Sequence, residues 1–167
     1  MEEGLKSEQQ YRKMPAVTDS CAEMAAASDF CGEIRRIFPQ RPVDIRTYSP
    51  LALAFLGDGI YSAIVRTMVI SQGNRQAKKL HDQTRRFVSA GAQARIGDAI
   101  GELLTDEEQR IYHRGRNANP PHHAKSASYE EYMKATALET LCGYLYLKGE
   151  TARFLELLKA GIEKAGI

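Results

Sequence analysis

The pattern of hydrophobic and polar positions changes near residue 50 and remains helical from there to the end of the chain. Two segments, 51–66 and 135–147, are apolar nearly all round, which is typical of central helices surrounded by other elements. The segment 151–164 is amphipathic, and its predicted core residues are Phe154, Leu155, Leu157, Leu158 and Ile162. No segment alternates apolar and polar residues with a period of two. The sequence therefore predicts an all-α fold.

Local signals place the ends of the predicted helices. Ser49 followed by Pro50 predicts an N-cap with proline in the first turn. Capping boxes, in which a hydroxyl is followed three residues later by a carboxylate, predict two further starts at Thr105–Glu108 and Ser128–Glu131. The other predicted elements are a helix at 75–87 with Asn74 as its N-cap, a helix at 89–101, and a loop at 117–127 rich in asparagine, proline and histidine.

The first 42 residues differ from the rest of the chain. Residues 1–20 are polar and mixed in charge, which predicts a mobile segment. Residues 21–38 supply enough apolar side chains for one side of a short helix, and Pro39 and Pro42 follow it. We therefore divide the chain into an N-terminal extension at 1–42, partly disordered, and a single domain at 43–167.

Composition narrows the class of protein. A chain of 167 residues with 43% hydrophobic and 26% charged content is typical of one ordinary globular domain. The net charge of +2 is too small to indicate a nucleic-acid partner, so any basic surface must be local. Three widely spaced cysteines and the lack of a signal peptide predict a cytoplasmic protein with reduced thiols. Asp58 and Arg66 argue against a membrane-spanning role for residues 51–70.

Each of the two apolar segments carries a single carboxylate, Asp58 in the first and Glu139 in the second. An unpaired carboxylate is costly to bury, so it protonates or finds a cation. Because two central helices of a small bundle almost have to touch, the pair favours a shared divalent metal ion held by oxygen ligands. The alternative is a separate ion pair or hydrogen bond for each carboxylate. Thr136, on the same helix face as Glu139, could orient a metal-bound water or simply bond back to the helix backbone.

Two groups of basic residues are candidates for phosphate contacts. The first is the run from Arg114 to Asn117 with Lys125 further along, in which guanidinium groups match phosphate oxygens and Gly115 lets a backbone approach closely. The second lies on the predicted helix 75–87 and comprises Lys78, Lys79, His81, Arg85 and Arg86. Each group has an alternative: the arginines could complement the helix dipole, and the basic helix face could simply be solvated.

Several motifs, in the same order along the chain, resemble the ribonuclease III family. Leu53-Ala-Phe-Leu-Gly-Asp58 resembles its signature helix, and Ala137-Leu-Glu139-Thr-Leu-Cys-Gly143 resembles its second acidic motif. The resemblance is closer to Mini-ribonuclease III, the small branch that lacks the double-stranded-RNA-binding domain. The segments that resemble this branch lie between about residues 48 and 165 and are Leu80-His81, Arg86–Ala90, Ala92–Ala94, Arg114–Ala118, Lys134–Glu139 and Gly143–Leu147.

The resemblance implies a helical bundle like the ribonuclease III endonuclease domain. It implies a Mg²⁺-dependent endoribonuclease, with Mn²⁺ as a substitute, that cuts double-stranded RNA and leaves 5′-phosphates. Asp58 and Glu139 would be the catalytic residues and metal ligands. The residues that would bind RNA are Arg114, Arg116, Asn117, Lys125, His81, Arg85 and Arg86.

The resemblance also implies partners. The enzyme would be a homodimer in which each subunit cuts one strand, and its substrate would be the precursor of large-subunit (23S) ribosomal RNA. A large-subunit ribosomal protein is a candidate helper, and no membrane partner is expected. Apolar residues of the signature helix outside the protomer's own core, with Phe55 and Tyr61 as candidates, would be covered by the second subunit.

The chain departs from the family pattern in its acidic residues. Ribonuclease III proper has two further acidic positions, and neither is acidic here; Thr136 stands at one of them. Mini-ribonuclease III shares this reduced set, but Gly59 and Ser62 also replace the alanine and glutamate that are usual within the branch. These departures leave open an alternative from another class, a non-catalytic RNA-binding ribosome assembly factor on the same fold.

Overall fold

The computed structural model describes residues 30–39, 41–118 and 128–167. The chain divides into two compact units, Met1–Pro39 and Gln40–Ile167. The described part of the first unit is a short helix, α2 (Phe30–Ile37), within the segment predicted to be helical. The predicted mobility of residues 1–20 lies outside the described residues.

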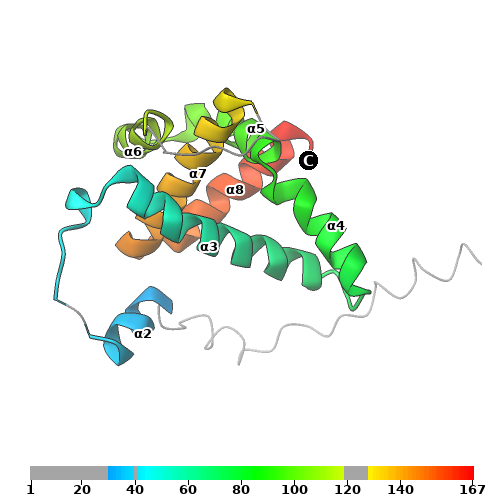
Figure 1. The fold of residues 1–167 in the computed structure, drawn as a ribbon, viewed down its shortest axis with the longest axis horizontal. Coiled ribbons are helices and arrows are strands. Elements are labelled where there is room, and N and C mark those ends of the chain that lie inside the picture. The colour runs from blue at the N-terminus through cyan, green and yellow to red at the C-terminus, as the bar shows by residue number, and fades with distance from the viewer. Residues whose placement is uncertain (1–29, 40, 119–127) are drawn as a thin grey trace, which may run out of the picture. The chain divides into compact units, whose positions relative to one another are not determined.

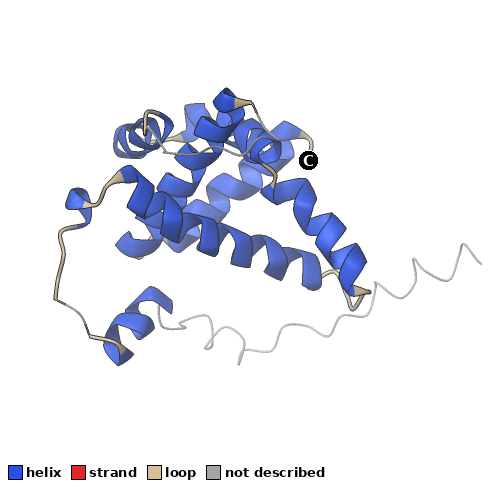
Figure 2. Ribbon diagram, viewed as in Figure 1, coloured by secondary structure: helices blue, strands red, loops and turns tan. Residues whose placement is uncertain are grey.

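The second unit consists of helices, and no strand occurs among the residues that the structure describes (Figures 1 and 2). This confirms the prediction of an all-α fold. The helices are α3 (Pro50–Ile70), α4 (Ala77–Val88), α5 (Ala90–Ile100), α6 (Asp106–Arg116), α7 (Tyr129–Lys148) and α8 (Thr151–Ala165), with single 3₁₀ turns at Ile45–Thr47 and Gly101–Leu103.

Most helix ends follow the local signals. The Ser49 hydroxyl accepts a hydrogen bond from the Ala52 amide at 3.1 Å, and both predicted capping boxes are formed. The Asn74 prediction is wrong, because α4 begins after Gln76 and has no side-chain cap. Gly73 has φ of 119°, and the chain has no regular secondary structure from Gly73 to Gln76, so the helix starts only after Asn74 has been passed.

Helix α7 is the centre of this unit and contacts α3, α5, α6 and α8. Side chains from these helices form one hydrophobic core, in which Leu138, Leu141 and Leu145 of α7 meet Phe154 and Leu157 of α8. The expectation that Leu155 is a core residue is wrong, since its side chain is 44% exposed. Its neighbours in α8 already occupy the side of the helix that faces the core.

Helix α3 is less enclosed than its apolar sequence predicts. Its inner residues pack in the core, but Phe55 is 86% exposed and Ile70 is 60% exposed. By length and composition alone α3 could cross a membrane, yet it carries Asp58 and Arg66 and packs along α7. One side of α3 is therefore uncovered in a single chain, and it carries the apolar residues Phe55 and Ile70 together with the charged residues Asp58 and Arg66.

Helices α3 and α7 pack against each other, and their backbones touch directly where two glycines meet the opposite helix. A Cβ atom on Gly57 would lie 1.8 Å from the carbonyl oxygen of Glu139, and one on Gly143 would lie 2.1 Å from the carbonyl oxygen of Leu53. Because the opposing atoms belong to the backbone, no side chain can move to make room. The absence of side chains at Gly57 and Gly143 therefore sets the spacing between α3 and α7.

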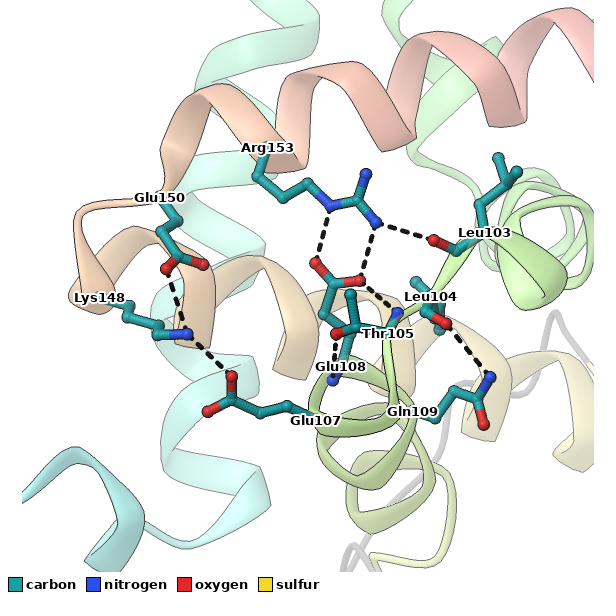
Figure 3. A network of polar contacts seen from close by, with 9 residues as sticks. All are labelled: Leu103, Leu104, Thr105, Glu107, Glu108, Gln109, Lys148, Glu150 and Arg153. Atoms are coloured by element: carbon teal, nitrogen blue, oxygen red, sulfur yellow. Dashed lines mark hydrogen bonds and ion pairs between the residues drawn. The ribbon is translucent and has the colours of Figure 1, made fainter.

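A network of ion pairs fixes α6 against α8 (Figure 3). Arg153 of α8 donates to the two carboxylate oxygens of Glu108 at 2.8 and 2.9 Å and to the carbonyl oxygen of Leu103 at 2.8 Å. Glu108 also closes the capping box with Thr105, so one buried carboxylate caps α6 and holds α8. The hydrogen bond from Arg153 holds the pKa of Glu108 below its usual range. Lys148, the last residue of α7, forms an ion pair with Glu107 of α6 at 2.8 Å.

The glycine contact gives a direct test with a matched control on the same helix. We expect Gly57→Ala to lower the free energy of unfolding by about 3 kcal/mol or more, because the added methyl group meets backbone atoms. A Cβ at Gly59 would meet nothing within 4 Å, so Gly59→Ala should raise the free energy of unfolding by about 0.5–1 kcal/mol through helix propensity. Urea unfolding measures both, and equal effects of the two variants would contradict the close-contact account.

Candidate active site

The contact between α3 and α7 brings together the two carboxylates that the sequence singles out. Asp58 follows Gly57, which lies against the backbone of Glu139 itself. Asp58 is exposed, whereas Glu139 is partly buried. Burial raises the pKa of Glu139 to about 7, the negative charge of Asp58 acts in the same direction, and a hydrogen bond from Gln93 acts in the opposite one. The two groups therefore form one electrostatically coupled site.

Gln93 of α5 is part of this site, and sequence reasoning did not select it. Its side-chain Nε2 donates to Oε1 of Glu139 at 3.2 Å and to the carbonyl oxygen of Val88 at 3.2 Å. Gln93 is 3% exposed. In the sequence, Gln93 stands between two alanines in the segment Ala92–Ala94, and this segment was noted only because it resembles the family. A single amide between small apolar residues was the one signal that could have selected it.

Two roles were considered for Thr136, orienting a metal-bound water or bonding back to the helix backbone, and the structure distinguishes them. Its hydroxyl donates to the carbonyl oxygen of Tyr132, one turn earlier in α7, at 3.0 Å. The side chain is buried, with 5% exposure. Thr136 thus bonds back to its own helix, the second of the two roles considered.

The carboxylate pair suits a divalent cation. Two adjacent carboxylates repel each other, and a hard cation bound to both removes that repulsion while oxygen atoms serve as its ligands. In the described residues, no group of three or more His, Cys, Asp or Glu side chains is placed to hold a metal. Asp58 and Glu139 would therefore supply the protein ligands, and water or RNA phosphate would supply the rest.

The two arginines at the end of α6 contact different parts of the chain. Arg114 donates through Nη2 to the carbonyl oxygen of Tyr48 at 2.8 Å, whereas Nη2 of Arg116 lies 3.9 Å from Oε1 of Glu130 in α7. Lys125 lies outside the described residues. A hollow beside Arg114 is lined by Pro50, Arg110, His113, Arg114, Asn117 and Ala118.

Two residues of this hollow, Arg110 and His113, were not among the predicted RNA-binding residues. They share a helix face with Arg114 and Asn117, because the four positions are spaced by three, one and three residues. That helical spacing could have identified them from the sequence. Both side chains are exposed.

The role predicted for Gly115 is wrong. Gly115 is buried, and a Cβ atom there would lie 2.5 Å from the hydroxyl oxygen of Thr140 and 2.8 Å from Cα of Ala137. Its missing side chain makes room for α7 and not for a phosphate group. The close packing holds the arginine-bearing end of α6 next to the turn of α7 that carries Glu139.

Of the predicted basic residues of α4, Arg85 and Arg86 lie at the C-terminal end of the helix, which Gln93 links to Glu139, whereas His81 lies near its other end. His81 lines a second hollow with Arg66 of α3, while Arg85 and Arg86 are exposed in the last turn. The last two carbonyl oxygens of α4 are bound from the core, that of Phe87 by the Tyr61 hydroxyl at 3.0 Å and that of Val88 by the Gln93 amide.

Tyr61 was predicted to be covered by a second subunit, and this prediction is wrong. Its side chain is fully buried in the core of its own protomer, with 0% exposure, and its ring packs edge-on against Phe154. Its hydroxyl needs an acceptor inside the core, and the end of α4 supplies one. Phe55, the other candidate, remains uncovered.

Comparison with known proteins agrees with this arrangement. The sequence profile described as "Ribonuclease III domain" matches residues 51–150, which include both acidic motifs. The chain belongs to the ribonuclease III family. It is 40% identical over 119 residues to the Mini-ribonuclease 3 of Thermoanaerobacter sp., covering 71% of this chain and 84% of that protein. It is 41% identical over 125 residues to the Mini-ribonuclease 3 of Enterococcus faecalis, covering 74% of this chain and 95% of that protein.

A solved structure shows the same fold. The crystal structure of a protein from Fusobacterium nucleatum matches with a TM-score of 0.66 and 32% sequence identity, covering 73% of this chain and 94% of that one. Ribonuclease III enzymes act on double-stranded RNA, generally use divalent metal ions and are typically dimeric. Membership in the Mini-ribonuclease III branch makes this chain an endoribonuclease of double-stranded RNA. The non-catalytic alternative is therefore set aside.

The raised pKa of Glu139 predicts how the stability of the metal-free protein depends on pH. The pKa of an ordinary glutamate is 4.5, whereas burial raises the pKa of Glu139 in the folded protein to about 7. The folded state therefore binds the extra proton between these values, so the free energy of unfolding should fall as pH rises from about 5 to about 8. The contribution of this group is on the order of 2 kcal/mol.

Urea unfolding in a chelator across this pH range checks the prediction. Glu139→Gln should flatten the pH dependence and stabilise the metal-free protein at the upper end of the range. Glu163→Gln, on an exposed position of α8, serves as the control and should leave the dependence unchanged. A wild-type slope retained by Glu139→Gln would contradict the assignment.

Proposed function

We propose that this chain is a Mg²⁺-dependent endoribonuclease, with Mn²⁺ as a substitute, whose metal is held by Asp58 and Glu139. The observation that carries this proposal is the meeting of the two carboxylates at the contact between α3 and α7. Their mutual repulsion, which contributes to the raised pKa of Glu139, is what a bound divalent cation would neutralise. When bound, Mg²⁺ would activate a water molecule and neutralise charge that develops on the phosphate.

The two carboxylates have different surroundings and therefore different roles. Asp58 is exposed and lies where an RNA phosphate can approach, so it would bind the cation on the substrate side. Glu139 is recessed and held by Gln93, so it would anchor the cation from the protein side. Cleavage at this site leaves a 5′-phosphate and a 3′-hydroxyl, the products expected of ribonuclease III enzymes.

Basic side chains of α4 and α6, most of them at the C-terminal ends of these helices, would bind the RNA backbone. Both ends are fixed close to the acidic pair, α4 by the hydrogen bonds from Tyr61 and Gln93 and α6 by the packing of Gly115 on α7. A-form RNA is recognised mainly through its shape and phosphates. The proposed contacts are Arg114, Arg116, Asn117, Lys125, His81, Arg85 and Arg86, and the hollow on α6 adds Arg110 and His113.

The proposed assembly is a homodimer. The side of α3 that faces away from the core carries Phe55, an apolar residue that is 86% exposed. Two subunits related by a two-fold axis would bury this side and supply one centre for each strand of the duplex.

The proposed substrate is the precursor of large-subunit ribosomal RNA, and this step rests on the resemblance of the motifs to Mini-ribonuclease III. A large-subunit ribosomal protein as helper, a cytoplasmic location and the lack of a membrane partner remain predictions on the same ground. A cleavage assay that compares the large-subunit precursor with an unrelated duplex of equal length tests the substrate. Equal cleavage of the two would contradict a preference for the ribosomal precursor.

The first functional prediction concerns Asp58→Asn. Asparagine keeps the shape of the side chain but loses the charge that holds the cation, so cleavage in Mg²⁺ should fall by about 10³-fold or more, equivalent to several kcal/mol. Binding of duplex RNA should persist. The melting temperature of the metal-free variant should not fall, because the change removes a repulsion with Glu139. Near-normal turnover would exclude the proposed metal site.

The second concerns the arginines at the end of α6. Replacing Arg114 and Arg116 with alanine should weaken binding to all duplex sequences and reduce the slope of log K against log salt by about 1 for each phosphate group that is no longer bound. A matched variant with Lys159→Ala and Lys164→Ala removes the same charge from α8 and should bind nearly normally. Equally weakened binding in the two double variants would point to net charge as the cause.

The third concerns the dimer. Light scattering at micromolar concentration should give about twice the chain mass of 18.6 kDa. Phe55→Glu should give monomers, because a buried carboxylate without a partner is costly. Val43→Glu is the control, since Val43 is also apolar and 57% exposed but lies outside α3. A Phe55→Glu variant that stays dimeric would place the interface elsewhere.

A further inference from the structure

Gln93 is a buried polar residue whose position beside the acidic pair calls for an explanation. It lies on α5, a helix that carries neither carboxylate, and its side chain is 3% exposed. Burial of an amide is unfavourable unless its hydrogen bonds are made. The two bonds that Gln93 makes are both at the site, one to the Glu139 carboxylate and one to the Val88 backbone.

We propose that Gln93 is a positioning residue for the metal site, which holds one carboxylate oxygen of Glu139 and thereby fixes the direction in which the other oxygen can bind a cation. This inference rests on the proposed role of Asp58 and Glu139 as metal ligands. Residues that orient metal ligands through hydrogen bonds commonly change metal affinity by about 10–100-fold when they are replaced.

The orientation of the amide follows from its neighbours. Both groups that it meets, Oε1 of Glu139 and the carbonyl oxygen of Val88, are acceptors, so the NH₂ group must face them and both of its hydrogens are used. The opposite orientation would place the amide oxygen against two other oxygens. The oxygen of Gln93 is buried and has no hydrogen-bond partner in the described residues, so the two donated bonds are the hydrogen bonds of this side chain.

The anchor at Val88 makes this hydrogen bond directional. Val88 is the last residue of α4, and the preceding carbonyl oxygen, that of Phe87, is held by Tyr61 of α3. The junction between α4 and α5 is thereby fixed to α3, the helix that carries Asp58. Gln93 then connects this fixed junction to Glu139 on α7, so the two carboxylates are held relative to each other by side chains as well as by the backbone contact.

The test measures Mn²⁺ binding to the RNA-free protein by calorimetry, without any cleavage. Gln93→Met keeps the length of the side chain and removes the amide, so Mn²⁺ affinity should fall about 10-fold or more. Gln83→Met is the matched control, because Gln83 on α4 also has a buried, unpartnered side-chain oxygen but makes no bond to Glu139. Its Mn²⁺ affinity should equal that of the wild type.

The outcomes separate the two proposals. Lack of Mn²⁺ binding by the wild type would contradict the proposed metal site, and with it the role of Gln93. Wild-type binding together with equal affinity in Gln93→Met would overturn the positioning role alone. An equal fall in affinity in Gln83→Met would also overturn it, since the effect would then follow from packing.

A measurement on the wild type decides the matter even if Gln93→Met does not fold. The side-chain NH₂ resonances of Gln93 should shift during a Mg²⁺ titration, with the same midpoint as Mg²⁺ binding measured by calorimetry. The shift should be absent in Glu139→Gln. Resonances that do not move while Mg²⁺ binds would overturn the proposal.

Discussion

The backbone contact between α3 and α7 is the constraint on which the rest of the structure depends. Gly57 and Gly143 allow the helices to approach until the backbone of one meets the backbone of the other. Asp58 and Glu139 lie next to this contact, so the feature that packs the core also brings the two acidic side chains together. Replacing either glycine would move the site and the core at once.

The packing of α3 against α7 makes the ionised acidic pair unfavourable when no cation is bound. Burial of Glu139 and its proximity to Asp58 raise its pKa to about 7, so without a cation the site opposes full ionisation. The protein surrounds this costly pair with fixed contacts: Gln93 holds Glu139, Tyr61 and Gln93 hold the end of α4, and Gly115 packs α6 on α7. The fixed carboxylates suit a divalent cation, and they lie near the basic C-terminal ends of α4 and α6.

Local features of the sequence were sufficient to predict the helices and to select the two carboxylates. Caps such as Ser49 and Thr105 act within one turn, and a lone carboxylate in an apolar segment is visible without knowing what faces it. The role of Gln93, the burial of Tyr61 and the packing of Gly115 each depend on which helix lies opposite, which one sequence does not reveal. An apolar helix such as α3 has the same pattern whether its own chain or another covers it, so the pattern alone could not separate an exposed residue from a core residue.

The most direct test of the shared metal site is a crystal of the protein soaked in Mn²⁺ and examined by anomalous scattering. The account predicts one anomalous peak that lies within coordination distance, about 2.1 Å, of a carboxylate oxygen of Asp58 and of one from Glu139. The peak should be absent from crystals of Asp58→Asn. A Mn²⁺ ion bound to only one of the two carboxylates, or a peak that persists unchanged in the variant, would contradict the account.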